Sequence, residues 1–142
     1  MPIPCYPDFT PLDIELKNYL HPGLSLTEDG VSEFTFSLLY LFRDRYKYRI
    51  SMDRCGSRTN GCLIISGVQP AAPEKTFFMT PCGAPGQDVL EHLFKTHHYW
   101  KNISHSVLFS VQEKMEKCGI KFAPDRDNFD YIYLRKDPRC LI

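Results

Sequence analysis

A loop with two glycines, residues 80–87, stands between a predicted strand and a predicted helix. The first turn of a helix carries backbone N–H groups without partners and a partial positive charge. Gly83 and Gly86 would let such a loop approach a phosphate or pyrophosphate closely. The chain has neither G-x-x-x-x-G-K-[ST] nor G-x-G-x-x-G, and Pro81 and Pro85 remove two donors from the loop. Two interpretations therefore stay open, an anion-binding loop or an ordinary connection from strand to helix.

A polar segment, residues 125–130, comes directly before a predicted strand with the pattern Tyr-x-Tyr. The segment holds three carboxylates together with Arg126 and Asn128. Polar loops at the end of a strand often carry substrate sites. The carboxylates could act as bases or orient an amine. In the structural alternative, Arg126 pairs with Asp127 or Asp130 and only fixes the turn.

Sequence motifs that support other common reactions are absent, and a charged segment that could bind a ligand has a simpler structural explanation. Arg43-Asp44-Arg45 follows an apolar segment, where cations suit the C-terminal end of a helix. The chain has no G-x-S-x-G and no H-E-x-x-H, so hydrolase and zinc-protease templates have no support. Its six cysteines form no C-x-x-C pair, and its five histidines lack the i, i+4 spacing of a metal site. We therefore predict reduced thiols and no metal site.

Length and charge restrict the class of protein further. The chain has 142 residues with 17 basic and 17 acidic side chains, and apolar residues make up 43% of it. These values are typical of one globular domain, residues 1–142. The neutral balance disfavours a general nucleic-acid binder, which usually carries a basic excess. No apolar run reaches the roughly 20 residues of a membrane span, and the first residues lack a signal-peptide pattern. We expect a cytoplasmic protein without a membrane span.

Hydrophobic spacing divides the first half of the chain into helices followed by strands. A first helix is predicted from an N-cap at Thr10 to a stop at His21-Pro22-Gly23. Residues 30–42 fit a helix or a strand about equally, and their length favours the helix. Three strands, at residues 46–52, 62–66 and 76–79, are predicted to form an antiparallel meander with a hairpin turn at Asn60-Gly61.

Helices and strands alternate in the second half. A helix is predicted at residues 88–100, with Trp100 on its apolar face. A capping box at Ser110 to Glu113 predicts that another helix starts there and ends at Gly119. Short strands are expected at residues 106–109, 120–122 and 131–134. This order predicts an α+β fold with helices packed on a mainly antiparallel central sheet.

Three segments share their pattern with one known family. The most specific is Asp125-Arg126-Asp127-Asn128-Phe129-Asp130-Tyr131-Ile132-Tyr133-Leu134. The others are Glu33-Phe34-Thr35-Phe36 with Leu41-Phe42-Arg43-Asp44, and Phe77-Phe78 with Pro81-Cys82-Gly83. Together they resemble the phosphatidylglycerol lysyltransferase C-terminal-like family, a bacterial family of unknown function. The resemblance extends from about residue 8 to residue 137.

The resemblance implies a fold and a domain organisation. Members of the family are built from two tandem GNAT-like (acyl-CoA N-acyltransferase-like) domains. By this resemblance residues 32–44 form a helix, and helices cover both faces of the central sheet. Family members continue after the Tyr-x-Tyr strand into the second domain, whereas this chain stops at Ile142. We therefore expect the chain to correspond to the first of the two domains.

The resemblance also implies a cofactor site. In GNAT enzymes the loop before the long helix binds the pyrophosphate of coenzyme A. Carried over to this chain, that role belongs to Gly83, Ala84, Gly86 and Gln87. The sequence departs from the usual loop pattern, because Thr80 stands where Arg or Gln is expected and Pro85 where Gly or Ala is expected.

Two functional hypotheses result. In the first, the chain is a half-site or interaction domain that pairs with a second GNAT-like domain or with itself as a homodimer. In the second, it is a minimal acyltransferase that uses a coenzyme A thioester and an amine acceptor. Proton transfer at the amine would then involve Asp130, Tyr131 or Tyr133. The candidates for substrate binding are Arg43, Arg126, Asp127 and Asn128.

Overall fold

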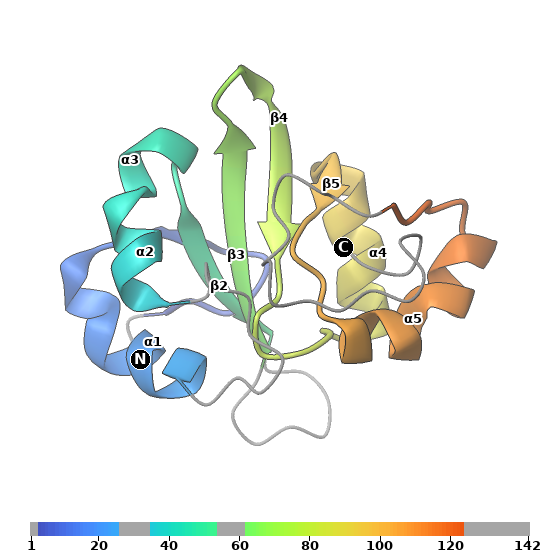
Figure 1. Cartoon of the computed structure of the whole chain (residues 1–142), viewed down its shortest axis with the longest axis horizontal. Helices are drawn as coiled ribbons and strands as arrows, with labels where there is room; N and C mark the ends of the chain where they lie inside the picture. The colour runs from blue at the N-terminus through green and yellow to red at the C-terminus, as the bar shows by residue number, and fades with distance from the viewer. Residues whose placement is uncertain (1–2, 26–34, 54–61, 124–142) are drawn as a thin grey trace.

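The computed structural model describes residues 3–25, 35–53 and 62–123 of the chain. Along the chain, short helices follow the short strand β1 and precede a group of three strands, and β5 comes after α4 and before α5 (Figure 1). The elements are β1 Thr10–Pro11, the 3-10 helix η1 Ile14–Leu16, α1 Lys17–Ser25, α2 Phe36–Leu41, α3 Arg43–Tyr46, β2 Arg49–Asp53, β3 Cys62–Gln69, β4 Ala72–Met79, α4 Gln87–Thr96, β5 Tyr99–Trp100 and α5 His105–Lys117.

The strands form one sheet in the order β1-β2-β3-β4-β5 within the described residues. The pairs β1–β2, β2–β3 and β3–β4 are antiparallel, whereas β4 and β5 run parallel. The predicted meander of three antiparallel strands is thus confirmed as β2, β3 and β4. The parallel pair at one edge makes the whole sheet mixed, which corrects the prediction of a mainly antiparallel sheet. Helix α4 forms a crossover that brings β5 back parallel to β4. The predicted α+β class is confirmed.

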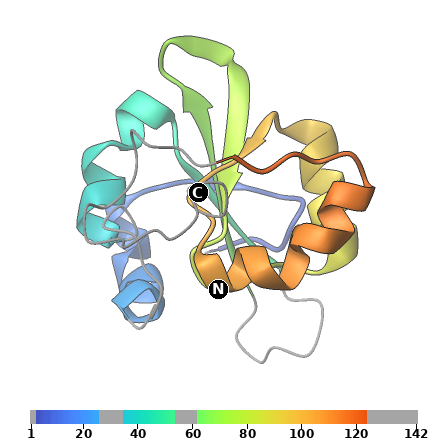
Figure 2. The ribbon, with the colours of Figure 1, turned by 45° about the vertical axis from the view of Figure 1, so that its right-hand side comes forward.

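Helices cover both faces of the sheet, as predicted (Figures 1 and 2). Successive side chains of a strand point to opposite faces, so β3 contributes to two separate apolar cores. Ile65 packs in the core formed with α1 and α2, and Ile64 packs in the core formed with α4 and α5. On β4, Phe77 belongs to the first core and Phe78 to the second.

The first predicted helix starts later and ends later than the sequence indicates. Thr10 is not its N-cap, because Thr10 and Pro11 pair with β2 as the edge strand β1, where the missing N–H of proline is tolerated. Asp13 caps the helical segment instead, accepting the N–H of Ile14 at 2.6 Å. The helix also continues through the predicted stop at residues 21–23. Leu16, Leu20 and Leu24 are all buried at intervals of one helical turn, so the apolar face of the helix continues to Leu24. The burial of Leu24 outweighs the cost of the helix-breaking residues before it.

The ambiguous segment before the meander is helical where the structure describes it. Thr35 is extended and caps α2, accepting the N–H of Leu38 at 3.3 Å. The helix implied by the resemblance is therefore confirmed in Phe36–Leu41 and continues after a break at Phe42 as α3. The strand predicted from residue 46 begins only at Arg49, because α3 extends to Tyr46 and Lys47 adopts a left-handed conformation with φ of 53°.

The helix after the glycine loop is shorter than predicted. It ends at Thr96, and Trp100 lies on β5 rather than on the helix. Pairing of Tyr99 and Trp100 with Phe77 and Phe78 supplies the backbone hydrogen bonds that a longer helix would have made internally.

The last helix is longer than predicted and replaces a predicted strand. Residues 106–109 belong to α5, whose N-cap is Ser104, so the capping box at Ser110 does not start a helix. Leu108, Val111 and Met115 are buried at helical spacing, which explains why a helix is favoured over a strand. The predicted end is confirmed, with Gly119 just after the helix at φ of 90°. Residues 120–122 form no strand.

Several predicted features lie outside the described residues. They are the turn at Asn60-Gly61, the polar loop at 125–130 and the strand at 131–134. Within the described ranges, no helix has the length and apolar character needed to cross a bilayer.

Candidate functional site

The predicted glycine loop connects β4 to α4 and brings the four expected coenzyme residues together. Gly83 has φ of 117°, a conformation that only glycine adopts readily, and its N–H donates to the Thr80 carbonyl at 3.3 Å. The Cys62 thiol donates to the Gly83 carbonyl at 3.0 Å. Gly86 is the N-cap of α4 and has an extended backbone. The loop is therefore a fixed turn held to the neighbouring strand β3.

A buried carboxylate already occupies the helix end of this loop. Asp53, at the end of β2, is 3% exposed, and its Oδ2 accepts the N–H of Gly86 at 3.0 Å. A negative charge is favourable there because the N-terminal end of a helix is partially positive. The same position is the one that a phosphate would use. The buried side chain of Asp53 thus provides the Gly86 N–H with a hydrogen-bond acceptor from within the protein.

The other two expected coenzyme residues are engaged elsewhere. Ala84 packs against the core between α4 and α5. The Gln87 side chain lies along its own helix, where Nε2 is 3.3 Å from Glu91 Oε1 and 3.6 Å from Met115 Sδ. The structure therefore gathers the four residues into one loop but directs both glycine N–H groups and the Gln87 amide to protein partners.

The ends of the parallel strands β4 and β5 are joined by side chains next to the loop. Trp100 Nε1 donates to Thr80 Oγ1 at 3.1 Å, and both residues are buried. Asn102 follows with φ of 54° and donates from Nδ2 to Met79 Sδ at 3.2 Å. The carboxyl ends of parallel strands are common places for ligands in α/β sheets. Here Trp100 fills that place.

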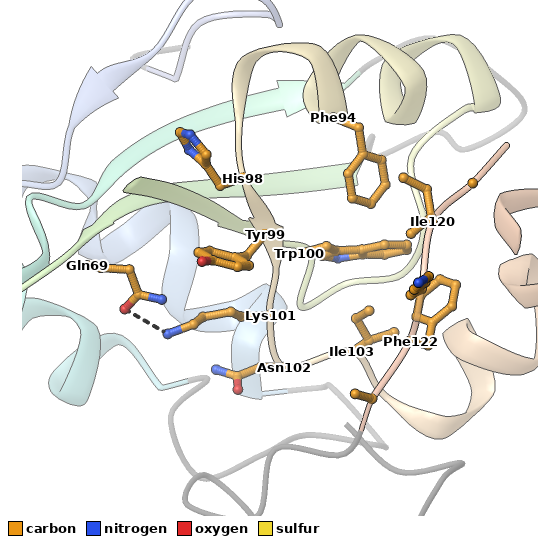
Figure 3. Close-up of a pocket in the computed structure, with 13 residues that line it drawn as sticks. Gln69, Phe94, His98, Tyr99, Trp100, Lys101, Asn102, Ile103, Ile120 and Phe122 are labelled. Carbon is orange, nitrogen blue, oxygen red and sulfur yellow. Dashed lines mark hydrogen bonds between the residues drawn. The ribbon is translucent and has the colours of Figure 1, made fainter. Parts of the chain in front are cut away.

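A pocket of about 600 Å³ lies beside β5 (Figure 3). Phe94, Trp100 and Phe122 form one wall, with ring centroids 6.1 Å apart for the first two and 6.4 Å apart for the last two. At the other end, Lys101 Nζ lies 3.1 Å from Gln69 Oε1. The described lining residues include no carboxylate. The chemistry of the walls suits an apolar or aromatic group with an acceptor directed toward Lys101.

The sequence does not predict this pocket, because its apolar spacing places Trp100 on a helix. After the end of α4, the apolar Trp100 stands between the more polar Tyr99 and Lys101. This alternation of polar and apolar residues is the signal that indicates a short strand with two different faces. Tyr99 and Lys101 lie on one side of β5 in Figure 3, and Trp100 lies on the other.

The remaining predicted site residues do not join the loop. Arg43 is half-buried at the start of α3, on the opposite side of the sheet from α4 (Figure 1). Its Nη1 donates to the Tyr40 carbonyl at 2.7 Å, and its Cζ lies 3.7 Å from the centroid of the Tyr40 ring. These contacts give Arg43 a structural role. The other candidates lie outside the described residues: Arg126, Asp127, Asn128, Asp130, Tyr131 and Tyr133.

No metal centre is found in the part of the chain that the structure describes, where no three His, Cys, Asp or Glu side chains form a suitable group. Comparison with protein-family models, curated proteins and solved structures finds no match. The family suggested by the sequence segments therefore stays a prediction.

Proposed function

We propose that the chain is a GNAT-like domain that acts as a half-site or interaction domain of an aminoacyl- or acyltransferase-like protein. The order of its elements supports the proposal. After the short strand β1, the helical segments η1 to α3, three antiparallel strands, a glycine loop, a helix, a parallel strand and a further helix follow one another. This agrees with the order that the resemblance implies. Its partner is a second GNAT-like domain or a second copy of the chain, and the cytoplasm remains the expected location.

The hydrogen bond between Asp53 and Gly86 is the observation that supports a domain without catalytic activity of its own. A pyrophosphate at the start of α4 would lie close to the buried carboxylate. Two like charges 4 Å apart repel by about 4 kcal/mol at the effective dielectric constant of a protein surface. That energy corresponds to a loss of roughly a thousandfold in affinity. The loop is therefore a poor coenzyme A site.

Titration calorimetry with acetyl-coenzyme A tests the proposal directly. The wild-type protein should give no binding heat at concentrations where acetyltransferases saturate. Asp53→Asn keeps a side-chain acceptor near Gly86 but removes the charge, so any latent affinity should appear in this variant. Pantetheine, which lacks the pyrophosphate, is the control ligand. Micromolar binding to the wild-type protein that is lost with pantetheine would contradict the proposal.

The second candidate, a minimal acyltransferase, has one observation in its favour. A glycine with positive φ precedes a helix whose N-terminus faces the loop, and this is the arrangement from which anion sites are built. That function requires the wild-type protein to bind acetyl-coenzyme A. The same titration therefore separates the two functions.

Self-association has its own measurement. Sedimentation velocity over a hundredfold range of protein concentration should reveal a dimer if the partner is a second copy of the chain. A protein that remains monomeric throughout would assign the partner role to a different GNAT-like domain.

A further inference from the structure

A serine and a histidine meet at the C-terminal end of α4, away from the loop at its N-terminal end. Ser66, on β3, places its Oγ 2.9 Å from Nε2 of His97, the residue that follows the helix. Both side chains are partly buried, so they lie at the surface of the core rather than within it. Thirty-one positions separate the two residues along the chain. Only the fold brings them together.

The hydrogen bonds of His97 define which nitrogen carries the proton. Nδ1 lies 2.9 Å from Thr96 Oγ1 and 3.2 Å from the carbonyl oxygen of Leu93, which can only accept. The Thr96 hydroxyl donates its own hydrogen to the carbonyls of Leu93 and His92, at 3.2 and 3.4 Å, so it accepts from Nδ1. Nδ1 is therefore the protonated nitrogen, and Nε2 of the neutral ring accepts the hydrogen of Ser66 Oγ. Burial lowers the pKa of His97, and the neighbouring His98 and His92 lower it further, against the opposing hydrogen bond to Leu93. The ring is thus neutral at neutral pH.

A hydroxyl that donates to a neutral imidazole, with the ring oriented by a third group, is the arrangement of an activated nucleophile and its base. Ser66 supplies the hydroxyl and His97 the base. The Thr96 hydroxyl and the Leu93 carbonyl orient the ring through Nδ1.

A cation lies next to the serine. Arg49 is the direct cross-strand partner of Ser66 in the β2–β3 pair, so their side chains point to the same face. Arg49 Nη2 donates to the Phe9 carbonyl at 3.4 Å, and Cζ lies 5.8 Å from the Phe9 ring centroid. The Phe9 ring is 6.2 Å from the His97 ring. Contacts therefore connect all four residues, and the exposed guanidinium is available to an anionic group.

We propose that Ser66 is an acyl acceptor for activated carboxylic esters that carry an anionic group. Ser66 Oγ attacks the carbonyl carbon, and its proton passes to His97 Nε2. The bond to the leaving alkoxide or phenoxide breaks, and the leaving group takes up the proton from His97. The products are acyl-Ser66 and an alcohol or phenol, with no change of oxidation state. Arg49 binds the anionic group of the ester. The site is independent of the coenzyme loop.

Acylation of the full chain by 4-nitrophenyl hydrogen succinate tests this site, with peptide mapping by mass spectrometry as the readout. The peptide that contains Ser66 should gain one succinyl group faster than any other serine peptide. Ser110 is the matched control, since it is an exposed serine whose Oγ donates to the Val107 carbonyl at 2.8 Å and, within the described side chains, contacts no histidine. The comparison of the two peptides within the wild-type protein requires no variant.

Three variants assign the roles. Ser66→Ala should abolish the labelling of that peptide. His97→Gln should slow it by about 100-fold or more, the usual contribution of a general base. Arg49→Gln should slow labelling by the succinate ester more than labelling by the neutral 4-nitrophenyl acetate. Equal labelling of Ser66 and Ser110 in the wild-type protein would overturn the proposal, and so would an unchanged rate in a folded His97→Gln protein.

Discussion

Asp53 at the end of β2 and Gly86 at the start of α4 are joined by a hydrogen bond of 3.0 Å between a carboxylate oxygen and a backbone N–H. The bond connects the meander to the helix that follows it. It also satisfies one of the N–H groups that a helix leaves without an internal partner. One contact therefore caps the helix and fills the position of a bound anion.

Replacement of Asp53 should show how much this contact stabilises the fold. Asp53→Ala leaves the Gly86 N–H without this acceptor and should lower the free energy of unfolding by about 1–3 kcal/mol. Asp53→Asn should cost less, because an amide oxygen can still accept. Urea denaturation of both proteins provides the measurement. Asp88→Ala, an exposed change in the first turn of α4, is the control and should stay within about 1 kcal/mol of the wild type. Equal losses in Asp53→Ala and Asp88→Ala would contradict a special role for the cap.

Acid should destabilise the protein through His97. Its pKa is lowered in the folded state, whereas a histidine in an unfolded chain titrates near 6.5. Below that pH the unfolded chain binds a proton that the folded protein resists, so the free energy of unfolding falls as the pH drops. The stabilisation is complete above about pH 7.5 and is lost as the pH falls through 6.5 toward the lowered pKa. Urea denaturation at pH 7.5 and 5.5 should show a smaller difference for His97→Gln than for the wild type. An identical difference would assign the acid sensitivity to other groups.

A methyl group at position 67 should disturb the sheet. A Cβ on Gly67 would lie 2.6 Å from the tip of the Phe77 ring, which is buried and faces Gly67 across β3 and β4. Gly67→Ala should therefore lower the free energy of unfolding by about 1–3 kcal/mol. The penalty should shrink in the background Phe77→Leu, because the shorter side chain leaves room for the methyl group. Additive losses in this double-mutant cycle would show that the ring is not the cause.

The hydrogen bond from Trp100 to Thr80 should be visible in fluorescence, since Trp100 is the only tryptophan of the chain. Thr80→Val keeps the size of the side chain but removes the acceptor. The buried indole N–H then loses its partner, at a cost of about 1–3 kcal/mol. A shift of the tryptophan emission maximum should accompany the loss. Thr80→Ser retains the hydroxyl and should preserve the wild-type spectrum, whereas a spectrum unchanged in Thr80→Val would argue against this bond.

The sequence predicted the elements whose signals are local. Short continuous apolar runs located β3 and β4, and Gly119 located the end of α5. Two predictions were wrong because the strands concerned, β1 and β5, depend on partners that are distant in the sequence. Thr10 and Pro11 become a strand only because β2 offers an edge, and Tyr99 and Trp100 only because β4 does.

The candidate site shows the same division. The loop around Gly83 was located correctly, because a glycine-rich turn before a helix is a local pattern. The carboxylate that lies against the loop was not predictable, since Asp53 is 33 positions away from Gly86. The approach of Ser66 to His97 likewise follows from the tertiary fold, and no spacing in the sequence indicates it.

Because apolar side chains cover both faces of β3, hydrophobic burial alone does not determine how β3 aligns with β4. In a sheet with one wet face, a slip of one residue would expose apolar side chains to water. Here the same slip would exchange Ile64 and Ile65 between two apolar layers and leave both covered. Gly67 is the only position of β3 without a side chain, and the Phe77 ring lies over it. The contact between Gly67 and Phe77 therefore favours the observed alignment, because a side chain in place of Gly67 would collide with the ring.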